Sequence, residues 1–358
     1  MPAPIQVLIV DDSAVACELL RHILESDPGI KVARCVRDGA EALEALATTM
    51  PDVITMDIHM PGMNGFEVTR QIMETRPVPV VIVSASFDPQ EVANAFNAME
   101  AGAVAALEKP RGPAHPEHAK AARQLVATVK AMAGVRVVKR WPRARHVART
   151  PTSAAPTRKA TAAHSAEIRL VAIGASTGGP PVLQTLLAAL PKPFPAPIVI
   201  VQHISAGFSQ GLAEWLSQTA GLPVAIARHG KRAEPGHAYI APDGLHLAVE
   251  KTGVFTCTPG EPENGMCPAV SSLFRSIAHN YGASAAGVLL TGMGRDGADG
   301  LKLMRDHGAV TFAQDKESSV IHGMPGAAIT LEAAVYILPP EGIANTIGSL
   351  ITRRTETR

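Results

Sequence analysis

The chain has 358 residues, of which 46% are apolar and 18% charged, so it is neither wholly disordered nor fibrous. At about 150 residues per domain, this length predicts two domains. Aromatic residues make up only 4% and the net charge is +1. Composition therefore favours neither a stacking platform for single-stranded nucleic acid nor bulk attraction to a polyanion, and we expect no nucleic-acid partner.

The sequence predicts neither a secretory signal nor a membrane span. The first apolar run reaches Asp11 and Asp12 with no basic segment before it, and no stretch of about eighteen apolar residues occurs. The four cysteines form no C-x-x-C pair, which favours reduced thiols and a cytoplasmic protein. They are Cys17, Cys35, Cys257 and Cys267.

Residues 1–125 alternate short apolar runs with segments of helical periodicity, which is typical of a doubly wound parallel α/β sheet. The expected strands are 5–10, 31–36, 52–56, 79–83 and 104–107. The expected helices are 14–25, 39–47, 66–75, 89–101 and 115–132.

Residues 126–166 are interpreted as a basic linker. No Asp or Glu occurs from His118 to Ala166, and the part after Trp141 is rich in Pro, Ala, Thr and Ser. Such a segment is too polar and too often interrupted by proline to bury a core. A solvated tether is the simplest interpretation. Electrostatic docking to an acidic partner or to nucleic acid is the alternative, and no recognition motif supports it.

Residues 167–358 again alternate, and they predict a second α/β domain with a small antiparallel insertion at 237–257. The expected strands are 168–173, 198–201, 224–227, 285–290, 309–312 and 334–338. The expected helices are 181–190, 208–218, 270–281, 298–307 and 342–351.

Charged and polar side chains follow the strands of the first domain. Asp11 and Asp12 end the first strand, and Asp57 follows the third. Ser84 follows the fourth strand and Lys109 the fifth. Because the carboxyl ends of parallel strands meet at one edge, these groups form one pocket, in which the carboxylates suit Mg²⁺. Asp57 is then a candidate phosphoryl acceptor, with Ser84 and Lys109 binding the other phosphoryl oxygens.

These segments resemble a response-regulator receiver domain. The matching stretches are VDDSA (10–14), MDIHMPGMNG (56–65), VSAS (83–86) and EKP (108–110). The resemblance implies a flavodoxin-like fold, phosphorylation of Asp57 and a chemotaxis-type histidine kinase as phosphodonor. The sequence departs from the family at Ala106, where receivers usually carry an aromatic switch residue.

In the second domain, Ser176 lies in a G-x-S-x-G turn between an expected strand and an expected helix. Glycines permit a sharp turn that presents the hydroxyl at the sheet edge, close to the free N–H groups of a helix N-terminus. A phosphate-binding turn and a plain N-cap serine have the same pattern, so both remain as alternatives.

A base and an orienting carboxylate are also available. His203 follows the next strand, and Asp296 lies in the glycine-rich segment after the strand 285–290. Asp296 is suited to orient the histidine and to stabilise its imidazolium form.

The same segment also has the dinucleotide-binding pattern. Gly292, Gly294 and Gly297 have the G-x-G-x-x-G spacing, and Asp315 lies about twenty residues further on, as a ribose ligand would. Ser176 and His203 have no role in nucleotide binding, and they favour hydrolysis.

Five blocks of the second domain resemble the chemotaxis protein-glutamate methylesterases. They are GASTGGP (174–180), VQHI (201–204), YIAPDG (239–244), LLTGMGRDGADGL (289–301) and QDKESSVIHGMPGAA (314–328). The resemblance implies a Rossmann-like domain in which Ser176 is the nucleophile, His203 the general base and acid, and Asp296 the orienting carboxylate. The backbone N–H of Met293 would donate to the oxyanion, and no cofactor is expected in this domain.

The same resemblance implies the substrate, which would be a glutamate γ-methyl ester on a methyl-accepting chemoreceptor, with methanol released. Some family members also deamidate receptor glutamines. Phosphorylation of Asp57 would uncover Ser176, which the receiver otherwise covers. Residues 266–271 lack the family's usual basic, histidine-containing stretch and aspartate. That departure leaves a receptor of a non-motility pathway open, and also a catalytically drifted, phosphorylation-dependent binding module.

Overall fold

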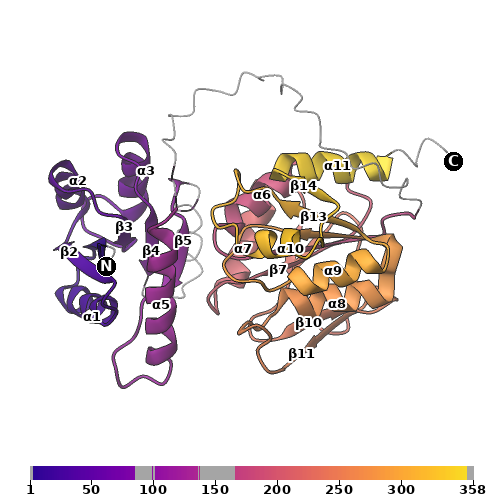
Figure 1. Cartoon of the computed structure of the whole chain (residues 1–358), viewed down its shortest axis with the longest axis horizontal. Helices are drawn as coiled ribbons and strands as arrows, with labels where there is room; N and C mark the ends of the chain where they lie inside the picture. The colour runs from indigo at the N-terminus through magenta and orange to yellow at the C-terminus, as the bar shows by residue number, and fades with distance from the viewer. Residues whose placement is uncertain (1–2, 85–98, 100, 136, 138–165, 353–358) are drawn as a thin grey trace.

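The computed structural model describes residues 3–84, 99, 101–135, 137 and 166–352. Within these residues the chain forms two α/β units, which lie side by side in Figure 1. The expected helix 89–101 and most of the expected linker lie outside the described residues. Among the helices that the structure does describe, none has the length and apolar character to cross a bilayer.

The first unit is a parallel five-stranded sheet in the order β2–β1–β3–β4–β5, which confirms the predicted doubly wound fold. Its strands are β1 (Ile5–Val10), β2 (Ile30–Val36), β3 (Val53–Met56), β4 (Val80–Ser84) and β5 (Ala105–Glu108). Its helices are α1 (Ala14–Glu25), α2 (Gly39–Thr48), α3 (Gly65–Thr75) and α5 (His118–Met132). Strands β3 and β4 are buried throughout because helices cover both faces of the sheet.

Short polar side chains define where the first three helices begin. Ser13 accepts a hydrogen bond from the Ala16 backbone N–H, and Asp38 and Asn64 cap α2 and α3 in the same way. Helix α5 continues beyond residue 125, where the linker was expected to begin. It buries Val129 and Met132 against the sheet, so the folded part of the first unit extends to Met132.

The second unit is a seven-stranded parallel sheet in the order β14–β13–β12–β6–β7–β9–β8. Its strands are β6 (Leu170–Ala175), β7 (Ile198–Gln202), β8 (Val224–Ile226), β9 (Ala238–Ile240), β12 (Ala285–Leu289), β13 (Val310–Gln314) and β14 (Tyr336–Leu338). Its helices are α6 (Gly179–Ala189), α7 (Ser209–Thr219), α8 (Val270–Tyr281), α9 (Ala298–Asp306), α10 (Met324–Thr330) and α11 (Pro340–Thr352).

Two local predictions for this unit need correction. The antiparallel insertion is smaller than expected, because β9 joins the main sheet in parallel with β7 and β8. Only β10 (His246–Val249) and β11 (Phe255–Thr258) form an antiparallel pair. Helix α10 was not predicted, because Pro325 and Gly326 suggest a loop. The proline lies at the start of the helix, where no backbone N–H is needed.

The strand order reverses beside β6, which has β7 on one side and β12 on the other. In open α/β sheets, such a reversal leaves a crevice at the carboxyl ends of the strands. The segments after β6, β7 and β12 contain Ser176, His203 and residues 291–297, and they all begin at this edge.

A substitution at Gly65 tests the packing of the first unit, because a Cβ atom there would lie 2.2 Å from the Asp57 backbone oxygen. We expect Gly65→Ala to destabilise this unit by about 1–3 kcal/mol. Hydrogen exchange of the β1 and β3 amides in the whole chain measures the effect. Gly112→Ala is the matched control, since no atom lies within 4 Å of its added Cβ. Equal exchange in the two variants would contradict the expectation.

Candidate active site and phosphoacceptor site

Ser176 lies in a tight turn between β6 and α6 and is 7% exposed. Its backbone N–H donates to the Thr291 carbonyl (3.0 Å), and its carbonyl accepts from the Gly179 N–H (2.8 Å). Gly178 ends the turn with φ of +76°, a conformation that favours glycine. The turn therefore holds the serine at the carboxyl edge of the sheet, next to the first residues after β12.

His203 and Asp296 are in direct contact. The distance from His203 Nε2 to Asp296 Oδ2 is 2.9 Å, and both side chains are almost fully buried. His203 Nδ1 is also buried and has no hydrogen-bond partner within the described part of the chain. The pairing leaves Nδ1 as the nitrogen that is available to a further group.

Asp296 is held by the start of α8. Its carboxylate accepts from the backbone N–H groups of Val270 (2.7 Å) and Ser271 (3.1 Å) and from Asn264 Nδ2 (3.2 Å). Burial opposes ionisation, but the hydrogen bonds from His203 and Ser271 outweigh it and hold the pKa of Asp296 well below its usual range. Asp296 is therefore a carboxylate at neutral pH.

The segment 266–271, where the sequence departs from the family, thus braces the site through backbone groups. Val270 and Ser271 hold the carboxylate through their backbone N–H groups, and the buried Ser271 hydroxyl also accepts from the Gly297 N–H (2.8 Å). Sequence analysis missed Asn264 and Ser271, since no periodicity or motif marks them.

Gln202 is a third residue that sequence analysis missed. Its side-chain Nε2 donates to the backbone carbonyls of Ser176 and His203, at 2.8 Å each. The His203 N–H in turn donates to the Ala175 carbonyl (2.9 Å). A buried amide at the end of an otherwise apolar strand is the signal that would have found it, because such a group needs partners.

The glycine-rich segment after β12 packs closely against neighbouring side chains of the same unit. A Cβ atom on Gly292 would lie 2.6 Å from Ser176 Cβ and 2.4 Å from Met324 Sδ, so this glycine is required by close contact. Asp315, the expected ribose ligand, accepts instead from the N–H and hydroxyl of Ser318. This packing supports no dinucleotide site. Met293 lies in the same segment with its side chain 38% exposed, beside the serine turn.

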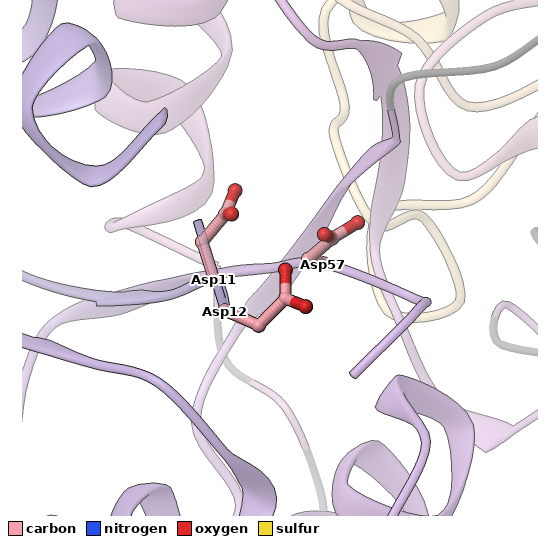
Figure 2. Close-up of side chains that lie close together, drawn as sticks. All are labelled: Asp11, Asp12 and Asp57. Carbon is pink, nitrogen blue, oxygen red and sulfur yellow. The ribbon is translucent and has the colours of Figure 1, made fainter. Parts of the chain in front are cut away.

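The carboxylates of the first unit converge as predicted. Oxygens of Asp11, Asp12 and Asp57 lie within 4.8 Å of one another, and Figure 2 shows the three side chains together at the strand ends. Lys109 Nζ lies 2.7 Å from Asp11 and 3.0 Å from Asp57. Ser84 ends β4, and its carbonyl accepts from the Lys109 N–H (2.7 Å), so all five predicted residues lie at this edge.

The electrostatics of this pocket suit a divalent cation. Burial raises the pKa of Asp11, although the contact with Lys109 opposes this rise; the neighbouring charge of Asp57 adds a smaller contribution in the same direction as burial. Burial acts in the opposite sense on Lys109, but the two carboxylates outweigh it and raise the pKa of that ammonium group. One lysine therefore leaves the carboxylate charge only partly compensated, and oxygen ligands of this kind are those that Mg²⁺ prefers.

The two units contact each other near both sites. Val320 and Ile321 of the second unit pack against the apolar cluster of the first unit that includes Val83 and Leu107. A cavity of about 360 Å³ lies between the units, lined on one side by Lys109, which follows β5, and by residues of β5 and α5. Its other side is lined by Ser205 and Ala206, which follow His203.

The low pKa of Asp296 predicts that the second unit becomes less stable at acidic pH. Stability from its ionised form is complete above the ordinary pKa of 3.8 and is lost as the pH falls below that value. We expect the urea midpoint of the second unit to decrease as the pH falls from about 4 to about 2. Trp215 fluorescence in a Trp141→Phe background reports it, because Trp215 is buried in α7. An unchanged pH dependence in Asp296→Asn would contradict this assignment.

Comparisons with known proteins agree with this architecture. Residues 171–347 match the CheB methylesterase family, and residues 7–119 match the response regulator receiver domain. A protein-glutamate methylesterase/protein-glutamine glutaminase of Geobacter metallireducens is 54% identical over 97% of this chain and 99% of its own. A protein of the same description from Nitrosospira multiformis is 51% identical over 99% of each chain.

A solved structure is also similar to the second unit. The catalytic domain of Thermotoga maritima CheB methylesterase is 39% identical, with a TM-score of 0.49, and the match covers 52% of this chain and 98% of that one. Both domain matches fall in the order that the sequence predicts. With relatives of 54% and 51% identity along nearly its whole length, the chain belongs to the protein-glutamate methylesterase/protein-glutamine glutaminase family, with a receiver domain in front of the methylesterase domain.

Proposed function

We propose that this protein hydrolyses glutamate γ-methyl esters on chemoreceptors, releases methanol, and is switched by phosphorylation of Asp57. The observation that carries the proposal is the buried His203–Asp296 pair beside the Ser176 turn, with one imidazole nitrogen available. Family membership supports the same activity.

In the proposed reaction, the Ser176 hydroxyl oxygen attacks the ester carbonyl. His203 takes the hydroxyl proton on Nδ1, since Nε2 is already bound to Asp296. The carboxylate of Asp296 stabilises the resulting imidazolium and fixes its orientation, as in a serine–histidine–aspartate triad. Because Asp296 stays ionised near neutral pH, it serves this role without changing its own protonation state.

The tetrahedral intermediate places negative charge on the former carbonyl oxygen. The backbone N–H of Met293, in the segment packed on the serine turn, is the proposed donor to that oxyanion. His203 then protonates the methoxide leaving group, and methanol departs. A water molecule, deprotonated by the same histidine, hydrolyses the acyl-enzyme. A glutamine side chain would follow the same course with ammonia as the leaving group, which is the basis for proposing deamidation as a second activity.

Removal of the nucleophile tests the reaction. We expect Ser176→Ala to lower methanol release from methylated chemoreceptor membranes by roughly a thousandfold or more, because no other group replaces the acyl acceptor. Ser349→Ala on the far helix α11 is the control and should retain activity. If neither protein releases methanol, the chain acts instead as a phosphorylation-dependent binding module. Equal release by both would show that Ser176 is not the nucleophile.

The receiver is proposed to accept a phosphoryl group on Asp57 from a chemotaxis-type histidine kinase. Asp11, Asp12 and Asp57 would hold Mg²⁺, which would neutralise the carboxylates and the incoming phosphoryl oxygens. Lys109 is placed to bind a phosphoryl oxygen, since it already contacts Asp57. Ser84 would bind another from the end of β4. No cofactor is proposed for the methylesterase domain.

Phosphorylation would act through the contact between the units. Val320 and Ile321, which pack on the receiver, belong to the loop that covers the serine turn, because a Cβ on Gly178 would lie 2.6 Å from Val320 Cβ. A charge change at Asp57 that alters the receiver surface would therefore uncover Ser176. Ala106, buried in β5, supplies no aromatic switch, so coupling would depend on this contact.

A small phosphodonor tests the switch. With Mg²⁺ and acetyl phosphate, we expect methanol release to rise several-fold in the unsubstituted chain and not in Asp57→Asn, because the acceptor carboxylate is lost. Asp52→Asn, on the surface before β3, is the matched control and should respond normally. A full response in Asp57→Asn would show that phosphorylation of this residue is not the switch.

The domain limits follow from these assignments. We propose a receiver that extends to Met132, a basic linker up to residue 166, and a methylesterase domain from residue 167. The proposed substrate, a methyl-accepting chemoreceptor, would place the protein in the cytoplasm, peripheral to the membrane that holds the receptors.

A further inference from the structure

A tight surface turn in the loop before α8 reaches Asp296. Glu263 and Met266 exchange both backbone hydrogen bonds, at 3.0 and 2.9 Å, so Asn264 and Gly265 form a two-residue hairpin loop. Both loop residues have positive φ, +52° and +78°, as in the turns that Asn-Gly sequences favour. The side-chain amide of Asn264 donates to Asp296 Oδ1 (3.2 Å), so an exposed residue contacts a buried carboxylate.

An ion pair fixes this turn to helix α8. Arg275 donates to both carboxylate oxygens of Glu263, at 2.9 Å from Nη1 and 2.6 Å from Nη2. Such a bidentate pair fixes orientation as well as distance. Arg275 follows Ser271 by four residues, so the two lie on the same face of α8, and the Ser271 N–H donates to Asp296. One face of α8 therefore holds Asp296 directly and also holds the turn that carries Asn264.

The ion pair is better suited to fixing geometry than to stabilising the fold. The side chains of Arg275 and Glu263 are 49% and 31% exposed, and solvent screens pairs of this kind, so the pair adds little to stability. Its geometric effect is specific, because Asn264 binds Oδ1 of Asp296 whereas His203 binds Oδ2. The turn thus helps to fix the rotation of the carboxylate, on which the contact with His203 depends.

We infer that Asn264, held in place by the Glu263–Arg275 ion pair, is a positioning residue that orients the Asp296 carboxylate toward His203. The inference rests on the proposed esterase reaction, in which Asp296 fixes the orientation of His203. It also gives the departure from the family at residues 266–271 a structural counterpart, because an orienting donor comes from the turn that leads into this segment.

Removal of the amide tests the positioning role. Asn264→Gly deletes the donor and keeps a backbone that tolerates positive φ. In methanol release from methylated chemoreceptor membranes, we expect kcat to fall roughly tenfold with KM unchanged, because misorientation of Asp296 affects the reacting groups and not receptor binding. A raised KM with unchanged kcat would overturn the inference, because the turn would then contact the receptor and not orient Asp296.

Charge reversal tests the ion pair. Glu263→Arg and Arg275→Glu each bring like charges together and should lower kcat several-fold, whereas the double variant restores an ion pair and should recover most of the lost rate. Lys302→Glu is the matched control, since it reverses one partner of the exposed Lys302–Asp306 pair on α9 and should leave kcat unchanged. Full kcat in both single variants would contradict the role of the pair, as would a double variant as slow as the slower single one.

Nitrogen NMR of the full chain with labelled histidine makes the test independent of esterase activity. We expect Asn264→Gly to move the His203 Nε2 signal toward its position in Asp296→Asn, because a misoriented carboxylate accepts a weaker hydrogen bond. An Nε2 signal that does not move in Asn264→Gly would show the inference to be wrong, whatever the activity. If the signal moves but the unsubstituted chain releases no methanol, the positioning role stands and the proposed function fails.

Discussion

The buried carboxylate of Asp296 is the constraint around which the methylesterase domain is arranged. A carboxylate removed from water must be matched by hydrogen-bond donors, or the folded state loses several kcal/mol of stability. Asp296 receives hydrogen bonds from His203, from two backbone N–H groups at the start of α8, and from Asn264. These donors come from segments distant in the sequence, so the group that orients the histidine also joins the parts of the site.

The need to give buried polar groups hydrogen-bond partners also explains the contacts of Gln202. Its amide bridges the carbonyls of Ser176 and His203, which belong to the ends of neighbouring strands. The separation of the proposed nucleophile and the proposed base is thereby set by main-chain hydrogen bonds and one buried side chain, rather than by flexible surface groups. Sites built in this way need little reorganisation when charge develops.

Much of this arrangement was predictable because an apolar strand that ends abruptly at a polar residue is a local signal. Asp57 and His203 were found in this way, and the parallel sheet then brings such residues to one edge. Asn264 and Ser271 were not predictable, because their role depends on where a distant loop returns to the sheet. Strand β9 was assigned to the wrong sheet for the same reason, since three residues do not specify their partner. The glycine pattern at 292–297 had two explanations in sequence, and close packing of Gly292 on Ser176 favours the catalytic one.

The placement of Val320 has a thermodynamic consequence. This residue lies over the turn that presents Ser176 and also packs on the receiver, so in the proposed function receiver and receptor compete for one surface. Linkage makes such competition reciprocal, because a free-energy coupling between two sites acts equally in both directions. If phosphorylation favours receptor access, receptor binding must favour the phosphorylated receiver to the same degree. A densely packed receptor array would then retain the phosphorylated form preferentially and concentrate the activated enzyme at its own substrate.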